Sequence, residues 1–377
     1  MLLPLNKFPC LPTLFCGLLS LAAVSGSHAQ GTMEPMPVAE PFEPAKTVKI
    51  LFIGNSLSGN AAIYLPAFAR AGGNRVVIFM ATPGGKSLQQ HVDYLTAFEH
   101  DPADPKGHPY KKAKRPTDTQ EPKAYSLIEA LDSDKWDYVS LQQLSGLSYK
   151  PESFEPAAGK LIEVIHQHAP QAKVLAYQTW PYRADNPLFH TGEFTRAAMF
   201  EGIKTAYDGL ASKYRLRLVP AGEAFLAAEQ SPAWQFTPEP AFDGKNAPPD
   251  APLPKETGTL QRGWVRGPGG KLVLDAKHAN NFGCYLDAAV WYEVLFGEDV
   301  RPLTPKVVPG IDPEKAADLR RIAHEVVTVR GAARIPDSPE AVKRLEAPHS
   351  PATNAPDTTL SGAKPSPGAQ PTAAGDE

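Results

Sequence analysis

Residue types that together perform nucleophilic catalysis occur at opposite ends of the chain. Ser56 lies in the segment 54–58, Gly-Asn-Ser-Leu-Ser, directly after an apolar run that ends at Ile53. Far downstream, Asp275 precedes His278 by three residues. A serine hydroxyl needs a base to take its proton, and that base needs a carboxylate to orient its ring. The pattern predicts a Ser-His-Asp site in which Ser56, His278 and Asp275 are catalytic.

Each of these pieces also has a structural interpretation. A serine that follows a strand more often caps a helix than attacks a substrate. The Gly-x-Ser-x-Gly turn of α/β-hydrolases is missing, because Ser58 stands where its second glycine would be. The prediction of chemistry therefore depends on the ordered set and not on any single motif.

Between the serine and the Asp-His pair lie groups that suit an oxyanion hole. Gly85 follows the second apolar run of the chain, and Gln142 and Gln143 follow the third. Backbone N–H groups and amide side chains are the donors that stabilise a negatively charged oxygen. We expect the hole to use Ser56, Gly85 and either Gln143 or Gln142, with Ser145 as a further candidate.

Five more residues are candidates for contact with a substrate, and each has a structural alternative. Tryptophan rings can stack on sugar faces, although packing in a core or under a loop explains them equally well. A histidine one turn into the helix that follows Gly85 can line the site or lie on the helix surface. The candidates are Asn55, His91, Trp180, Trp234 and Trp264.

Short apolar runs alternate with helical patterns along most of the chain. The runs are 48–53, 75–80, 138–141, 173–177 and 217–219. The helical patterns are 61–71, 88–98, 124–131, 154–168 and 194–214, with further ones from about 280 and over 314–329. Parallel strands need helical crossovers between them. The pattern predicts a doubly wound, three-layer α/β sandwich with a central, mostly parallel five-stranded sheet, whose carboxyl edge gathers the candidate residues.

The remaining segments differ in composition from this core. Residues 1–29 contain an apolar stretch followed by Ser-His-Ala, as in a secretory signal peptide, which predicts a secreted or periplasmic protein. We expect a flexible leader over 30–46, one domain over 47–330 and a disordered tail rich in Pro, Ala, Ser and Thr over 331–377. Two insertions, about 100–122 and 231–270, interrupt the domain as binding loops or as a small satellite core.

Charge and composition argue against several classes of partner. The chain has 38 Lys and Arg against 41 Asp and Glu, a formal net charge of −3, so no basic surplus suits nucleic acid. No integral membrane segment is expected after signal cleavage. His166 and His168 lie two apart on a predicted helix and point to different faces, which is poor metal-ligand spacing. We therefore expect no metal and no cofactor.

The order of the motifs resembles that of the SGNH, or GDSL-like, hydrolases. That family has a serine after the first strand, a glycine after the second, an amide side chain after the third and Asp-x-x-His near the end. Here the matching residues are Ser56, Gly85, Gln143 or Gln142, and Asp275 with His278. The resemblance covers about 47–297 and implies an SGNH, flavodoxin-like fold. Within the family, the chain looks most like the DUF4886 branch, a domain of unknown function, through the segments 53–56, 84–88 and 136–145.

The resemblance implies an exported serine esterase that hydrolyses carboxylic esters, with acetyl groups on carbohydrates as the first expectation for the substrate. Two departures leave alternatives open. Asn55 stands where the family most often has Asp, and the Gly-x-Asn-Asp block after the third strand is missing. The alternatives are a catalytically degenerate binding module with the same fold and an acyltransferase that uses the same serine.

Overall fold

The computed structural model describes residues 42–111, 122–240, 242–248, 250–306 and 311–331. The chain divides into two units, 1–42 and 43–377, and every described helix and strand lies in the second. The predicted signal peptide, most of the predicted leader and all but the first residue of the predicted tail lie outside the described residues.

The predicted parallel sheet is confirmed. It contains five strands, all of them parallel, in the order β2, β1, β5, β6, β7. Their bounds are β1 (Thr47–Ile53), β2 (Arg75–Ala81), β5 (Tyr138–Leu141), β6 (Lys173–Tyr177) and β7 (Arg217–Val219). The chain winds from β1 to β2 and then returns to the other side of β1 to form β5. This reversal places a switch point between β1 and β5, where the carboxyl ends of parallel strands leave room for a ligand.

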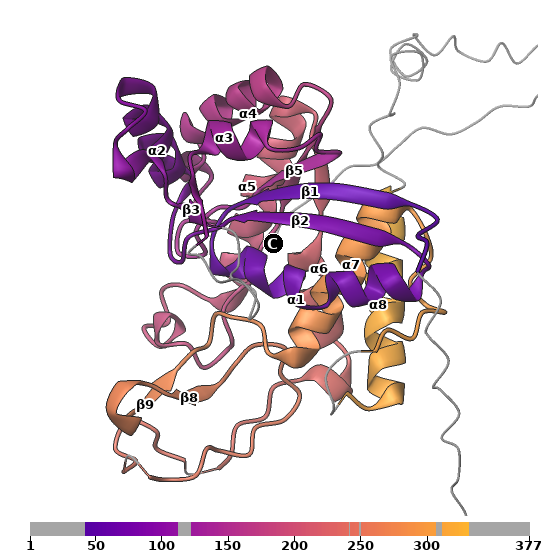
Figure 1. Ribbon diagram of the computed structural model, residues 1–377. Coiled ribbons are helices and arrows are strands. Elements are labelled where there is room, and N and C mark those ends of the chain that lie inside the picture. The colour runs from indigo at the N-terminus through magenta and orange to yellow at the C-terminus, as the bar shows by residue number, and fades with distance from the viewer. Residues whose placement is uncertain (1–41, 112–121, 241, 249, 307–310, 332–377) are drawn as a thin grey trace, which may run out of the picture. The chain divides into compact units, whose positions relative to one another are not determined.

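Helices cover both faces of the sheet, as Figure 1 shows. On one face lie α1 (Ser56–Ala71), α6 (Ala221–Glu229), α7 (Asn281–Phe296) and α8 (Pro313–Gly331). On the other lie α2 (Leu88–His100), α3 (Leu127–Asp132), α4 (Ala157–His168) and α5 (Arg196–Tyr214). Alternate residues of β1 enter the two cores: Ile50 and Phe52 pack toward the first set, and Leu51 and Ile53 toward the second. Burial on both faces explains the uninterrupted apolar runs.

Smaller elements occupy the two insertions and several connections. The first insertion contains the antiparallel pair β3 (Tyr110–Lys111) and β4 (Ala124–Tyr125), and the second ends near the pair β8 (Trp264–Arg266) and β9 (Leu272–Leu274). Single 3₁₀ turns are η1 (Pro105–Gly107), η2 (Pro151–Ser153), η3 (Pro187–Phe189), η4 (Pro232–Trp234) and η5 (Pro268–Gly270). In Figure 1 the β8–β9 ribbon projects away from the central sheet.

Helix boundaries differ from the predicted ones at several places. α1 begins at Ser56 and not at Ala61, because the Asn55 side chain accepts a hydrogen bond from the Leu57 N–H and caps the helix there. The predicted helix over 124–131 starts only at Leu127, since 124–125 pair as β4. α6 was not predicted, because it follows the three-residue strand β7 with only Pro220 between them.

The helix α7 carries an ionisable group into the core. Nearly all of the residues of α7 are buried. Although α7 is mostly apolar, neither it nor any other described helix is long and apolar enough to cross a membrane. Asp287, in the middle of α7, is fully buried, and its Oδ2 accepts a hydrogen bond of 2.5 Å from the Tyr177 hydroxyl. Its Oδ1 has no hydrogen-bond partner among the described residues. Burial raises the pKa of Asp287 to about 8, although the Tyr177 hydrogen bond acts in the opposite direction.

We expect Asp287→Asn to change the pH dependence of stability. Asp287 stays protonated up to about pH 8 in the folded protein but ionises near pH 4 in the unfolded chain. The folded state therefore binds an extra proton between these values, and the wild-type free energy of unfolding falls as pH rises, by up to about 1.4 kcal/mol per pH unit. Asparagine does not titrate, so urea denaturation of the variant should lack this part of the slope. Parallel profiles for the two proteins would contradict a buried proton on Asp287.

Candidate active site

The turn that carries Ser56 joins the central strand β1 to the first residue of α1. Gly54 and Asn55 are buried, whereas Ser56 is exposed at the carboxyl edge of the sheet. Because Ser56 is the first residue of α1, its N–H has no partner within the helix. The hydroxyl and this N–H are therefore both available at the position where parallel strands present their ligands.

The side chain of Gln142, at the end of β5, holds this turn in place through hydrogen bonds. Its side-chain oxygen accepts hydrogen bonds from the Asn55 N–H and the Ser58 hydroxyl, both of 3.0 Å. The amide group of Gln142 donates to the Gln143 carbonyl oxygen. A Cβ atom on Gly54 would lie 2.6 Å from both the Gln142 side-chain oxygen and the Ser58 hydroxyl. Glycine is thus required at position 54 by close approach and not by an unusual φ angle.

Asn55 links the serine turn to the loop that carries Gly85. Its side-chain oxygen caps α1, and its Nδ2 donates a hydrogen bond of 3.0 Å to the Lys86 carbonyl. Only 1% of Asn55 is exposed. The prediction that Asn55 contacts the substrate is therefore wrong, since its polar atoms are already used to hold two loops together.

The structure brings Ser56, His278 and Asp275 into one hydrogen-bonded chain. The Ser56 Oγ lies 2.8 Å from His278 Nε2, and the His278 Nδ1 lies 2.9 and 3.1 Å from the two carboxylate oxygens of Asp275. A carboxylate only accepts, so Nδ1 carries the proton and Nε2 is free to accept from the serine. This tautomer is the one that a general base requires.

Asp275 is held in its ionised form. Partial burial opposes the charge, but hydrogen bonds from the ring and backbone of His278 outweigh burial and lower the pKa of Asp275. The guanidinium of Arg262 lies 3.7 Å from Asp275 Oδ2 and adds to the positive surroundings. The carboxylate is therefore available to orient His278 across the neutral pH range.

Three neighbouring segments fix the loop that carries Asp275 and His278. The end of the second insertion pairs with it through the backbone: Arg262 N donates to His278 O at 2.8 Å, and Asp275 N to Gly263 O at 2.9 Å. From α1, Asn60 Oδ1 accepts from the Ala279 N–H at 3.3 Å. The Trp180 indole donates to the Lys277 carbonyl at 2.9 Å. Asn60 was not among the residues predicted from the sequence, although its place four residues after Ser56 puts it on the same helix face.

The predicted oxyanion donors have different environments in the structure. Gly85 is exposed, with a φ of +68° that favours glycine, in the loop that Asn55 ties to the serine turn. Gln143 is fully buried: its side-chain oxygen accepts from the Leu88 and Leu144 N–H groups, and its Nε2 donates to Ser153 O at 2.8 Å. Neither Gln143 nor Gln142 directs its amide to Ser56, so this part of the prediction is wrong. Ser145, the further candidate, is also buried and lies 3.0 Å from the Tyr182 hydroxyl.

His91 is neither a substrate ligand nor a surface residue. It is fully buried on α2, with Nε2 2.8 Å from the Gly54 carbonyl and Nδ1 2.7 Å from the Tyr110 hydroxyl. Because a carbonyl only accepts, Nε2 carries the proton and Tyr110 donates to Nδ1. Burial lowers the pKa of His91 to about 4, so its ring is neutral at physiological pH. His91 thus braces the end of β1, and the predicted substrate contact is wrong.

The predicted tryptophan contacts are replaced by packing. Trp180 is 1% exposed and stacks on Phe225 with 4.3 Å between ring centroids. Trp234 is also 1% exposed, and its indole donates to Asp318 on α8 at 2.8 Å. Trp264 is partly exposed and packs against Phe242 within the insertion. The contacts of Trp234 and Trp264, which lie in the second insertion, support its interpretation as a satellite core.

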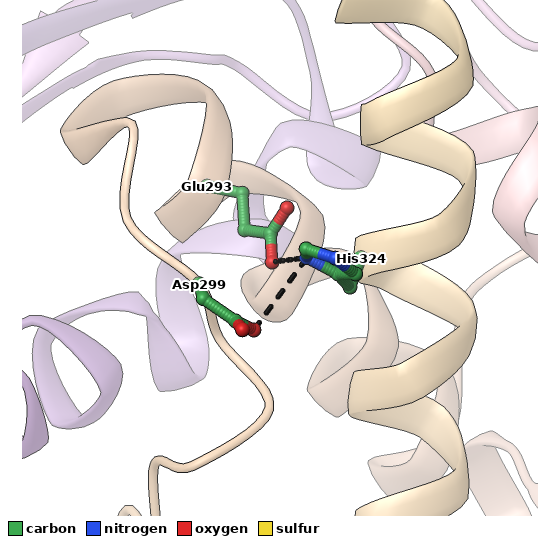
Figure 2. A group of neighbouring side chains, drawn as sticks. All are labelled: Glu293, Asp299 and His324. Atoms are coloured by element: carbon green, nitrogen blue, oxygen red, sulfur yellow. Dashed lines mark hydrogen bonds and ion pairs between the residues drawn. The ribbon is translucent and has the colours of Figure 1, made fainter.

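One group of metal-ligand residue types occurs within the described residues, away from the serine. It consists of Glu293, Asp299 and His324, and Figure 2 shows the His324 ring of α8 directed at the two carboxylates. The His324 Nδ1 lies 2.9 Å from Glu293 and 3.5 Å from Asp299. Glu293 also accepts from the Val300 N–H, so the group joins α8 to the end of α7 through its own contacts.

A cavity of about 530 Å³ also lies apart from the serine. It is lined by residues of β6, β7, α5 and the end of α8, and none of Ser56, Asp275 and His278 borders it. A second cavity, of about 280 Å³, lies beside Arg183, Glu229 and Gln261. The catalytic geometry, and not cavity size, therefore locates the candidate site.

Comparison with known proteins identifies the family that the chain resembles. The family model DUF4886, a domain of unknown function, matches residues 49–228. The predicted resemblance to DUF4886 is confirmed. A solved DUF4886 protein from Bacteroides uniformis is 25% identical to this chain, with a TM-score of 0.57, and the match covers 75% of this chain and 95% of that one.

Other solved structures resemble the chain more weakly. A candidate SGNH hydrolase from Slackia heliotrinireducens is 19% identical, with a TM-score of 0.40 and coverage of 66% of this chain and 98% of that one. A candidate GDSL-like lipase from Parabacteroides merdae is 13% identical, with a TM-score of 0.39 and coverage of 68% and 99%. No curated protein matches the sequence. The DUF4886 region contains Ser56 and Gly85 but ends before Asp275 and His278.

We expect Gly54→Ala to damage both the fold and the serine turn. The new Cβ would collide with Gln142 and Ser58, so the free energy of unfolding should fall by about 1–3 kcal/mol. The rate of reaction of Ser56 with a fluorophosphonate should fall with it. Gly59→Ala is the matched control, because a Cβ at Gly59 meets nothing within 4 Å and alanine favours the helix. A Gly54→Ala variant as stable as the control would contradict the role of Gln142.

Proposed function

We propose that this protein is an exported serine esterase that hydrolyses carboxylic esters, with acetyl esters of carbohydrates as its substrates. The observation that carries the proposal is the hydrogen-bonded chain from Ser56 through His278 to Asp275. The resemblance to SGNH hydrolases supports an acetyl group on a saccharide, and the pattern of residues 1–29 supports export. The buried positions of Trp180 and Trp234 take away two of the proposed sugar contacts.

The first half of the reaction forms an acyl-enzyme. The Ser56 Oγ attacks the ester carbonyl carbon while its proton moves to His278 Nε2, and Asp275 stabilises the imidazolium that results. The N–H groups of Ser56 and Gly85 donate to the oxyanion of the tetrahedral intermediate. When the intermediate collapses, the bond to the alcohol oxygen breaks and the alcohol leaves with the proton from His278.

The second half restores the enzyme. Water attacks the acetyl carbonyl and gives its proton to His278, and collapse of the second tetrahedral intermediate returns that proton to Ser56 and releases the carboxylic acid. A sugar alcohol in place of water would make the protein an acyltransferase. The alternative of an inactive binding module is disfavoured by the 2.8 Å contact between Ser56 and His278, which a binding module does not need.

We expect Ser56→Ala to lower kcat/KM for 4-nitrophenyl acetate by at least about 10³-fold, since the nucleophile is lost. Its melting temperature should stay near the wild-type value, because Ser56 is exposed and alanine is a good helix former. Ser212→Ala, at an exposed position on α5, is the control and should retain full activity. A fluorophosphonate should label the wild type and the control but not Ser56→Ala. Equal turnover by Ser56→Ala would refute the assignment.

A further inference from the structure

The segments that build the candidate site carry more positive than negative charge. These segments are 54–58, 83–88, 260–263 and 275–280, and their charged residues are Lys86, Arg262, Lys277 and Asp275. The whole chain, by contrast, has a formal net charge of −3. These four segments are therefore positive on balance, in contrast to the chain as a whole.

A hydrogen bond to a backbone atom holds each of these basic residues beside the catalytic groups. The Lys86 carbonyl accepts from Asn55, the residue before the nucleophile, at 3.0 Å. The Arg262 N–H donates to the carbonyl of His278 at 2.8 Å. Lys277 directly precedes His278, and its carbonyl accepts from the Trp180 indole. The backbone of each of the three basic residues is therefore fixed next to a catalytic residue or its loop.

The side chains of two of them remain close to the site. The Arg262 guanidinium is 3.7 Å from Asp275 Oδ2, and about half of the Arg262 side chain is exposed. The Lys277 ammonium lies 5.2 Å from the centre of the Tyr182 ring, and the Tyr182 hydroxyl contacts Ser145 beyond the end of β5.

The only acidic group of these segments does not neutralise them. Asp275 carries one negative charge; its two oxygens accept from His278, and Oδ2 also pairs with the Arg262 guanidinium at 3.7 Å. Two nearby acids, Asp185 and Glu256, each make paired contacts with the buried guanidinium of Arg183. Asp275 and the Arg183 cluster, which has two carboxylates against one guanidinium, offset two of the three positive charges, so one net positive charge remains around the site. A positive field favours negatively charged ligands and speeds their encounter.

We propose that the substrate is an ester whose alcohol part carries a negative charge, namely an acetylated acidic saccharide with a carboxylate group. This inference rests on the proposed esterase function. Because an acetyl group has no ionisable atom, the negative charge must lie on the alcohol that leaves. Arg262, Lys277 and Lys86 are then specificity-determining residues that favour the anionic substrate before and during attack by Ser56.

Two esters that differ in one charge test the proposal. 4-Acetoxybenzoate and its methyl ester share the acetyl group and the ring, but only the first is an anion at neutral pH. At about 20 mM salt, kcat/KM should be at least about tenfold higher for the anion than for the neutral ester. At about 0.5 M salt, where screening is strong, this anion-to-neutral ratio of kcat/KM should approach the ratio of the uncatalysed hydrolysis rates of the two esters. A ratio that salt does not change would overturn the proposal.

Charge-neutralising variants locate the effect. Arg262→Gln, Lys277→Gln and Lys86→Gln should each lower the anion-to-neutral ratio at low salt, by about threefold, as expected for one exposed charge. Lys160→Gln on α4 changes the net charge equally and should leave the ratio unchanged. A ratio unaffected by all three site variants, or lowered as much by Lys160→Gln, would show that the local charges do not select the substrate.

The outcomes also separate this proposal from the proposed function. Turnover of both esters by the wild type but not by Ser56→Ala, with no preference for the anion, would leave the esterase function and overturn the charge selection. If neither ester were hydrolysed, binding of the two esters to Ser56→Ala, measured by ligand-observed NMR, would decide the matter. Tighter binding of the anion would support a site for acidic ligands, and equal binding would overturn it.

Discussion

The side-chain oxygen of Gln142 is the contact on which the rest of the site depends. A buried carbonyl oxygen must find donors, and the donors here are the Asn55 N–H and the Ser58 hydroxyl, on either side of Ser56. The contact is short enough that position 54 has no room for a Cβ atom. The central strands β1 and β5 are thereby joined at their carboxyl ends, and the serine hydroxyl is left facing outward.

The two insertions each support one half of the catalytic group. Tyr110, from the first insertion, donates to His91, which in turn donates to the Gly54 carbonyl under the serine turn. Residues 260–263, from the second, pair with the loop that carries Asp275 and His278. Segments that interrupt the βα pattern therefore act as supports for the site, and the precision of the Ser56–His278 contact depends on both.

The sequence was sufficient for features that depend on local pattern. The five strands could be predicted from the apolar runs. Ser56, Asp275 and His278 could be predicted as a set from their order along the chain, although only the fold shows that they are in contact. The roles of Gln142 and Gln143 did not follow, because an oxyanion donor and a buried brace require the same amide group, and only the atoms around it tell them apart. Similarly, a tryptophan is equally suited to a sugar face and to a core. Trp180 packs on Phe225, 45 residues away in the sequence, a contact that no local spacing indicates.

The pairing of residues 260–263 with the catalytic loop uses backbone atoms at Arg262, Gly263, Asp275 and His278. Such hydrogen bonds do not depend on which side chain most of these positions carry. During evolution, the side chain at position 262 is therefore free to change its charge or size while the base stays in place. The second insertion thus separates two requirements that often conflict in an enzyme. The backbone of residues 260–263 keeps the catalytic loop in place, while the side chain at position 262 can change with the substrate.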